Sequence, residues 1–227
     1  MDKPAVAAFD FDETLTTKHS LRPFIRHIVG LPRLAAGVLR SVPWLIASAL
    51  RLVDRGTSKA RFLRATICGR TRLELEKAAE EFAAKKLPRM IRPEMAARIQ
   101  EHRRRGHRLV LVTASPDLYL VPWAKSAGFD AVLATELEFV NERCTGRLAT
   151  PNCWGKEKAK RLQEWLSAHQ PSLLYAYGDN RGDREMLAMA DRRWKRGDGA
   201  MPALDGAETR DVSRRQAARP LSEGPAA

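Results

Sequence analysis

The stretch Ala5–Thr16, AVAAFDFDETLT, decides the fold of this chain. Its first five residues form a short apolar run that predicts a buried strand, and two carboxylates, Asp10 and Asp12, follow directly. Because side chains alternate across a strand, both carboxylates face the same way if the extended backbone continues through Asp12. Carboxylates in that position can share a cation or divide the roles of acid and base. The alternative is a strand followed by an acidic turn, with Thr14 or Thr16 capping a helix.

Length and composition are those of a globular protein. A chain of 227 residues with 44% hydrophobic residues can bury a sizeable core as one domain, or as one domain with an insertion. The three cysteines, Cys68, Cys144 and Cys153, lack the spacing of zinc ligands, which favours a reducing cytoplasm. Only a short apolar run separates Lys3 from Asp10, so we expect no secretory signal peptide. The uncharged apolar stretches are also too short to span a bilayer.

Positive charge is concentrated in one part of the chain. The formal net charge of +13 is by itself compatible with binding to nucleic acid or to a membrane. The segment Thr17–Arg105 contains 21 lysines and arginines against 7 acidic residues, an excess of 14, so the remainder carries a net charge of −1. This distribution indicates a basic domain inserted after the first strand.

The basic insert is expected to be helical. The segment Leu21–Val53 is rich in Leu, Ile, Val, Ala and Trp and is interrupted by Pro32 and Pro43, which predicts two or three helices because proline disrupts a helix interior. Its stretch Ser41–Leu50, SVPWLIASAL, carries no charge and is bordered by arginines. That pattern is typical of a helical bundle with solvated arginines, and it also suits a helix lying on an anionic membrane surface. Two further helices are predicted, at Thr71–Lys86 and Glu94–Arg105.

The rest of the chain alternates predicted strands and helices, which indicates an α/β fold with a parallel sheet. Strands are predicted at His107–Thr113, Ala131–Ala134 and Leu173–Tyr177. Helices are predicted at Asp117–Gly128, within Asn152–Leu166 and at Met186–Ala190, and a hairpin or excursion at Glu136–Arg147. Apolar periodicity is lost after Trp194, and the composition of the tail Gly206–Ala227 predicts disorder.

Small and polar residues follow the predicted strands. At Thr113, Ala114 and Ser115, a hydroxyl and free backbone amides could hold a phosphate. Asp179 and Asp183 lie among glycines, which allow close approach of a ligand or metal. Each of these could also be an ordinary turn or helix cap, and the lysines of the helix between them could be a solvated face.

The order of these sites is more specific than any one of them. The motifs DFDET, LVTAS, GKEK and YGDNRGD, at 10–14, 111–115, 155–158 and 177–183, resemble those of the haloacid dehalogenase superfamily of phosphatases. The insert between the first two motifs is similar to the small helical caps of its type IB members. The resemblance implies a doubly wound Rossmann-like core. Residues 1–16 and 106–205 would form this core, 17–105 an inserted helical cap of the C1 type, and 206–227 a tail.

Matched residue by residue, the resemblance assigns the chemistry. It makes Asp10 the nucleophile that becomes an aspartyl phosphate, and Asp12 the general acid and then base. Thr113 would hold phosphate oxygens, and Lys158 would neutralise charge that develops around phosphorus. We prefer Lys158 to Lys156 because the lysine of this family usually lies three residues after the glycine of its motif.

The resemblance also implies Mg²⁺ as the cofactor. Its predicted ligands are Asp10, the backbone carbonyl of Asp12 and Asp179, with Asp183 supporting the site. Thr14 and Asn180 would assist by hydrogen bonding. Ala114 is a further candidate for contact with the substrate.

The substrate would be set by the cap. Phosphoserine phosphatases carry an acidic residue about nine positions after the nucleophile, where this chain has His19. From Lys18 to Arg72 there are 12 basic residues and one acidic residue. This cap looks more like that of phosphatidylglycerophosphatase C, which implies an anionic lipid phosphate and peripheral contact with the inner face of the membrane. The candidate substrate contacts are His19, Arg22, Lys59, Arg61 and Arg64.

Three other functions stay open at this point. A phosphatase acting on small metabolites, similar to phosphoserine phosphatase, would use the same core. A receiver-type signalling domain also combines paired aspartates, a hydroxyl and a lysine, but it needs no insert of this size. A non-catalytic basic adaptor for nucleic acid or membrane would explain the net charge and leave the ordered carboxylates unexplained.

Overall fold

A parallel five-stranded sheet lies at the centre of the molecule, with β1 (Val6–Phe9) as its middle strand. The structure, a computed structural model, describes residues 3–50 and 52–204. The strand order is β3-β2-β1-β6-β7, and the other strands are β2 (Arg108–Pro116), β3 (Ala131–Thr135), β6 (Leu174–Gly178) and β7 (Arg192–Lys195). The chain therefore reverses its direction of winding at β1, and ligands bind beyond the carboxyl ends of the strands at such a point. The predicted doubly wound α/β fold is confirmed.

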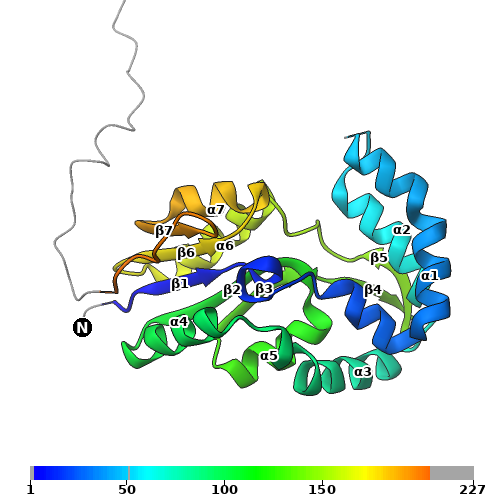
Figure 1. Cartoon of the computed structure of the whole chain (residues 1–227), viewed down its shortest axis with the longest axis horizontal. Helices are drawn as coiled ribbons and strands as arrows, with labels where there is room; N and C mark the ends of the chain where they lie inside the picture. Colours follow the sequence, from blue (N-terminus) through cyan, green and yellow to red (C-terminus); the bar gives the residue numbers. More distant parts are fainter. Residues whose placement is uncertain (1–2, 51, 205–227) are drawn as a thin grey trace, which may run out of the picture.

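Both faces of the sheet are buried, which explains why its strands read as continuous apolar runs. Val6 and Ala8 pack into one core, and Ala7 and Phe9 pack into another on the opposite face. Helices α6 (Lys156–His169) and α7 (Arg184–Met189) cover the first face, while α4 (Pro93–Arg104) and α5 (Asp117–Ala127) cover the second (Figure 1).

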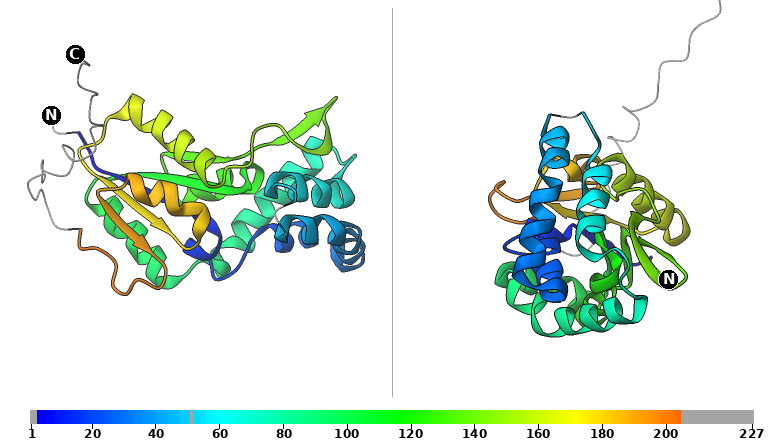
Figure 2. Two further views of the ribbon diagram at one scale, coloured as in Figure 1. Left: turned by 90° about the horizontal axis from the view of Figure 1, so that it is seen from above. Right: turned by 90° about the vertical axis from the view of Figure 1, so that its right-hand side faces the viewer.

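A second unit projects beyond the carboxyl ends of the strands. Helices α1 (Leu21–Ala49) and α2 (Arg55–Ile67) form its antiparallel pair, seen from two further sides in Figure 2. The hairpin of β4 (Leu137–Val140) and β5 (Arg143–Leu148) packs against α2, and α3 (Arg72–Lys85) packs against α5. Short helical turns lie at Leu87–Met90 and Arg181–Asp183, and Phe11–Leu15 forms a turn with non-helical backbone at Asp12 and Glu13.

Two elements lie in a different unit from the one that the sequence predicted. Residues 17–105 were expected to form the cap, but α4 lies under the sheet, where the Nε2 of its His102 is 2.8 Å from the hydroxyl of Tyr177. The β4–β5 hairpin comes from the core segment of the sequence and lies with α2. A charge boundary could not separate these elements, because α4 carries exposed arginines as well as the buried residues Met95, Ile99 and His102 that pack under the sheet. The predicted tail, 206–227, lies outside the described residues.

The interruption expected within α1 occurs at a different residue. The helix breaks once, at Gly30, whose φ is +74°, and it continues through Pro43. Pro32 falls in the first turn after the break, where a missing backbone N–H is tolerated. Strand β7 was not predicted, because in its sequence RRWK only Trp194 is buried.

Replacing Gly146 with alanine should loosen the contact between the β5 strand and the cap helices. Gly146 has a φ of +75°, and a Cβ atom there would lie 2.4 Å from the Cα of Arg64 in α2. We expect the free energy of unfolding to fall by about 2–4 kcal/mol, since backbone strain and overpacking add. Gly106→Ala is the matched control, because its φ is +69° and a Cβ there meets nothing within 4 Å. Urea denaturation should give a loss of about 1 kcal/mol for that control, and equal losses would contradict the packing argument.

Candidate active site

Asp10 is the first residue after β1, and its carboxylate is buried at the centre of the site. The backbone is extended at Asp10 and Asp12, as predicted, and then turns at Glu13, whose φ is +65°. This turn brings the Oγ1 of Thr14 back to the Asp10 carboxylate, to which it donates a hydrogen bond of 3.0 Å. The carboxylates of Asp10 and Asp12 consequently have different partners.

Lys158 is the cation that Asp10 contacts. Its Nζ lies 2.6 Å from Oδ1 of Asp10 and 2.5 Å from Oδ1 of Asp183, and only 2% of its side chain is exposed. Burial alone would lower the pKa of this lysine, but the two carboxylates outweigh burial and raise the pKa above its ordinary value. Lys158 therefore stays charged. Lys156, the other candidate, is exposed.

The turn after β6 supplies the other carboxylates. The Oδ2 of Asp183 accepts the backbone N–H groups of Asp179 and Asn180, at 3.0 and 3.1 Å. The side-chain amide of Asn180 donates to Oδ1 of Asp179 at 2.9 Å, and the Oγ1 of Thr14 lies 3.2 Å from the same oxygen, so its single proton is shared between Asp10 and Asp179. Gly178 allows the turn to fold back so closely, because a Cβ there would lie 2.6 Å from the Cβ of Asp183.

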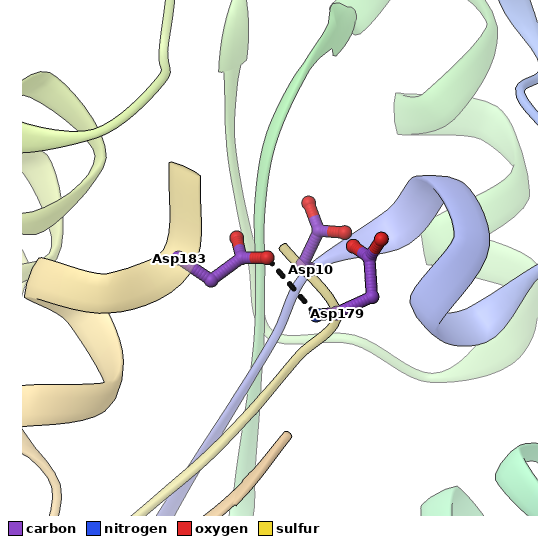
Figure 3. A group of neighbouring side chains, drawn as sticks. All are labelled: Asp10, Asp179 and Asp183. Carbon is purple, nitrogen blue, oxygen red and sulfur yellow. Dashed lines mark hydrogen bonds between the residues drawn. The ribbon is translucent and has the colours of Figure 1, made fainter. Parts of the chain in front are cut away.

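Asp10, Asp179 and Asp183 form a cluster that could hold a cation (Figure 3). One carboxylate oxygen from each lies within 4.8 Å of the others. Burial raises the pKa of Asp10 well above its ordinary range; repulsion from Asp183 and Asp179 adds to this effect, and Lys158 opposes it. Burial also raises the pKa of Asp179. A set of oxygen ligands with surplus negative charge suits a hard divalent cation.

The Asp12 carboxylate lies outside this cluster and is held by polar groups from two other segments. Its Oδ1 accepts the backbone N–H of Ser20 at 2.7 Å, and its Oδ2 accepts the hydroxyl of Ser115 at 2.5 Å. His19, which is 66% exposed, reaches to 4.0 Å from Oδ2. A carboxylate held in this way could exchange protons with a molecule bound beside the cluster.

The end of β2 forms another wall of the site. Thr113 is buried there, and its Oγ1 accepts the backbone N–H of Ser115 at 3.1 Å. The Nζ of Lys59, from α2 of the cap, donates to the carbonyl of Ala114 and to the side chain of Asn152. Burial lowers the pKa of Lys59 to about 8. Sequence reasoning missed Asn152, although its position just before the GKEK motif was a signal.

The three cap arginines that were predicted to contact the substrate do not approach the carboxylates. Arg22 is exposed on α1, and Arg64 is exposed on α2 with its backbone against Gly146. Arg61 stacks on Trp44 with its guanidinium carbon 4.3 Å from the ring centroid. Arg64 lies about 140° around the helix from Lys59, and Lys59 faces the core, so Arg64 cannot do so as well.

A parallel sheet with an aspartate at the end of its central strand, and a lysine and an acidic turn beside it, defines a doubly wound α/β protein whose site is built around a carboxylate. Residues 7–188 match the haloacid dehalogenase-like hydrolase family, and the chain belongs to that family. The predicted superfamily and the predicted enzyme class, a hydrolase, are confirmed.

The chain is similar to other proteins over most of its length. Protein CicA of Caulobacter vibrioides is 41% identical over 192 residues, which are 84% of this chain and 85% of that protein. A protein of unknown function from Bordetella pertussis Tohama I has a similar structure, with a TM-score of 0.70 at 22% identity over 84% of this chain and 89% of that one. A substrate-bound phosphoserine phosphatase has a TM-score of 0.63 at 19% identity over 86% and 87% of the two chains. At these identities the two solved structures show a shared fold.

Replacing Lys158 with methionine should destabilise the protein as well as alter the site. Without the ammonium group, Asp10 and Asp183 are left buried and uncompensated, so we expect the free energy of unfolding to fall by about 3–5 kcal/mol. Lys156→Met, two residues away on the exposed side, should change it by less than about 0.5 kcal/mol. Denaturant titration with a chelator present measures both. Equal stabilities of the two variants would show that the buried pairs contribute nothing.

Proposed function

We propose that this chain is a magnesium-dependent phosphomonoester hydrolase that works through an aspartyl-phosphate intermediate. The observation that carries the proposal is the buried contact of Asp10 with Lys158, next to the carboxylates of Asp179 and Asp183. The Asp10 carboxylate could act as a nucleophile. Its substrate would need an electrophilic atom, and it would need negative charge that the ammonium group of Lys158 and a bound cation can stabilise. A phosphoryl group meets both conditions.

The reaction takes two displacements at phosphorus. In the first, an oxygen of Asp10 attacks, the bond from phosphorus to the ester oxygen breaks, and Asp12 gives a proton to the leaving alcohol. In the second, Asp12 takes a proton from water, the water oxygen attacks the same phosphorus, and the bond to Asp10 breaks to release inorganic phosphate. Ser115 and the backbone of Ser20 hold the Asp12 carboxylate throughout.

The remaining residues bind phosphate and cation. Thr113 and Lys158 would contact phosphoryl oxygens, and their hydrogen-bond donors would stabilise charge on them. Mg²⁺ would be held by Asp10, Asp179 and the backbone carbonyl of Asp12. It would offset the repulsion between the carboxylates and the phosphate dianion. Asp183 supports this site, because its two oxygens already accept Lys158 and two backbone amides.

The proposed substrate is an anionic lipid phosphate such as phosphatidylglycerophosphate, reached at the inner face of a membrane. The outer side of α1 carries exposed apolar residues, among them Leu39 at 73% and Ile46 at 55% exposure, with Arg33 and Arg40 exposed beside them. Apolar side chains bordered by arginines suit the interface of an anionic bilayer. Within residues 3–50 and 52–204, the structure contains no helix with the length and hydropathy of a membrane span.

Phosphate release in mixed micelles tests the proposed activity. We expect phosphatidylglycerophosphate to be hydrolysed with added Mg²⁺, the activity to be lost with a chelator, and Asp10→Asn to lower kcat at least about a thousandfold. Phosphoserine is the comparison substrate. Turnover of phosphoserine alone would overturn the lipid proposal and leave the core chemistry in place. Turnover that survives Asp10→Asn would overturn the aspartyl-phosphate mechanism.

Sedimentation with vesicles tests the membrane contact separately from catalysis. The protein should bind phosphatidylglycerol vesicles at low and moderate salt and bind phosphatidylcholine vesicles much less. A variant with Leu39→Ser and Ile46→Ser should bind about tenfold more weakly, because two apolar side chains no longer enter the interface. Leu73→Ser, which changes a leucine of 76% exposure on α3, is the matched control. Equal binding by all three proteins would refute the assignment of this surface.

A further inference from the structure

We propose that Arg55, Trp154 and Arg181 form a binding site for a second anionic group of the substrate, beside the site of the scissile phosphate. This inference rests on the proposed hydrolase function and extends it to the recognition of substrate. The ligand is an oxyanion, a phosphodiester or a carboxylate, carried by the same molecule as the phosphomonoester. None of the three residues takes part in the chemistry proposed above.

The three side chains join the cap to the core. The guanidinium carbon of Arg55, the first residue of α2, lies 4.8 Å from the centroid of the Trp154 ring. The guanidinium carbon of Arg181, from the turn after β6, lies 5.5 Å from the same centroid. Two positive groups from different parts of the chain are thus gathered at one aromatic ring.

The indole is held in place by a close contact that only glycine allows. A Cβ atom on Gly182 would lie 2.1 Å from the Nε1 of Trp154, so the ring rests directly on the backbone of the catalytic turn. The loop is tied to the same turn, because the backbone N–H of Gly155 donates to the carbonyl of Gly182 at 3.0 Å. The ring therefore offers the two arginines a fixed platform.

The two arginines have no anionic partner among the residues that the structure describes. Neither guanidinium forms an ion pair with a carboxylate in that part of the chain. Burial lowers the pKa of Arg55, and the charge of Arg181 lowers it further. Stacking of an exposed arginine on an aromatic ring contributes only about 0.5–1 kcal/mol. An oxyanion bound by the guanidinium donors would neutralise the charge that the fold has gathered there.

This pair of arginines borders the proposed catalytic centre. Arg181 lies in the turn between Asp179 and Asp183, which belong to the carboxylate cluster. Arg55 lies one helical turn before Lys59, whose ammonium group reaches the carbonyl of Ala114 at the end of β2. A molecule with its phosphate at Asp10 and a second anion near this end of α2 would bridge the two sites.

Two substrates that both carry the scissile phosphate on a primary hydroxyl of glycerol test the second anion. Glycerol 3-phosphate has none, whereas glycerophosphoglycerophosphate, the water-soluble headgroup of the proposed lipid, adds one phosphodiester. The wild-type protein should have a higher kcat/KM for the second. The ratio of the two kcat/KM values should fall at least about tenfold in Arg181→Gln and in Arg55→Gln, since hydrogen bonds to a charged group are lost. Arg184→Gln, an exposed arginine three residues further on, should move the ratio by less than about twofold.

A comparison of phosphoserine with glycerol 3-phosphate, run in parallel, distinguishes the kind of anion. If the arginine variants lower kcat/KM, relative to glycerol 3-phosphate, for the diester alone, the site binds a phosphodiester. If they lower this ratio for phosphoserine alone, the site binds a carboxylate. The proposal is overturned if the ratios do not change. It is also overturned if all substrates fall in parallel, because the Arg55, Trp154 and Arg181 contacts would then only fasten the cap to the core.

A binding measurement tests the second-anion site independently of catalytic activity. Calorimetry on Asp10→Asn, compared with the same variant carrying Arg181→Gln, should show at least about tenfold weaker binding of glycerophosphoglycerophosphate to the double variant. Equal affinities would overturn the second-anion site even if the enzyme is active. Absence of turnover by the wild-type protein, with the affinity difference intact, would instead overturn the proposed hydrolase function.

Discussion

The buried ammonium group of Lys158 is the interaction on which the site depends. It pairs with Asp10 at the end of β1 and with Asp183 in the turn after β6, residues that are 148 and 25 positions away in the sequence. Three carboxylates within 4.8 Å of one another repel strongly at low dielectric, and this cation offsets only part of that repulsion. A divalent cation would neutralise the remaining negative charge. The fold therefore supplies a cluster of carboxylates that could hold a cation.

The sheet determines which residues can meet at this cation. Because β1 is flanked by β2 and β6, the segments that follow all three strands emerge side by side at one edge. The segment after β1 contributes Asp10, and Ser115 at the end of β2 contributes the hydroxyl that holds Asp12. Winding in both directions from β1 is thus a condition of the chemistry, and it explains why residues so far apart in sequence act together.

The motifs and strands of the core could be predicted because they obey local rules. The apolar run before Asp10 and the glycines around Asp179 each have a direct physical meaning, and the structure brings these carboxylates together with Lys158. The cap could not be predicted at the same level. Its helices were expected from their pattern, but which face of α2 meets the core depends on packing against β5, where Gly146 admits the backbone of Arg64. That contact turns Lys59 inward and Arg64 outward, and no local pattern distinguishes the two.

The turn after β6 links the reaction centre to the recognition of substrate. Its amides at Asp179 and Asn180 are held by Asp183, so its backbone geometry is set by the same carboxylate that pairs with Lys158. Gly182, in that turn, carries the ring of Trp154. The position of the ring, and of the arginines stacked on it, is consequently coupled to the geometry of the cluster. This turn therefore carries Arg181, one of the residues proposed to recognise the substrate, between Asp179 and Asp183, which lie beside Asp10.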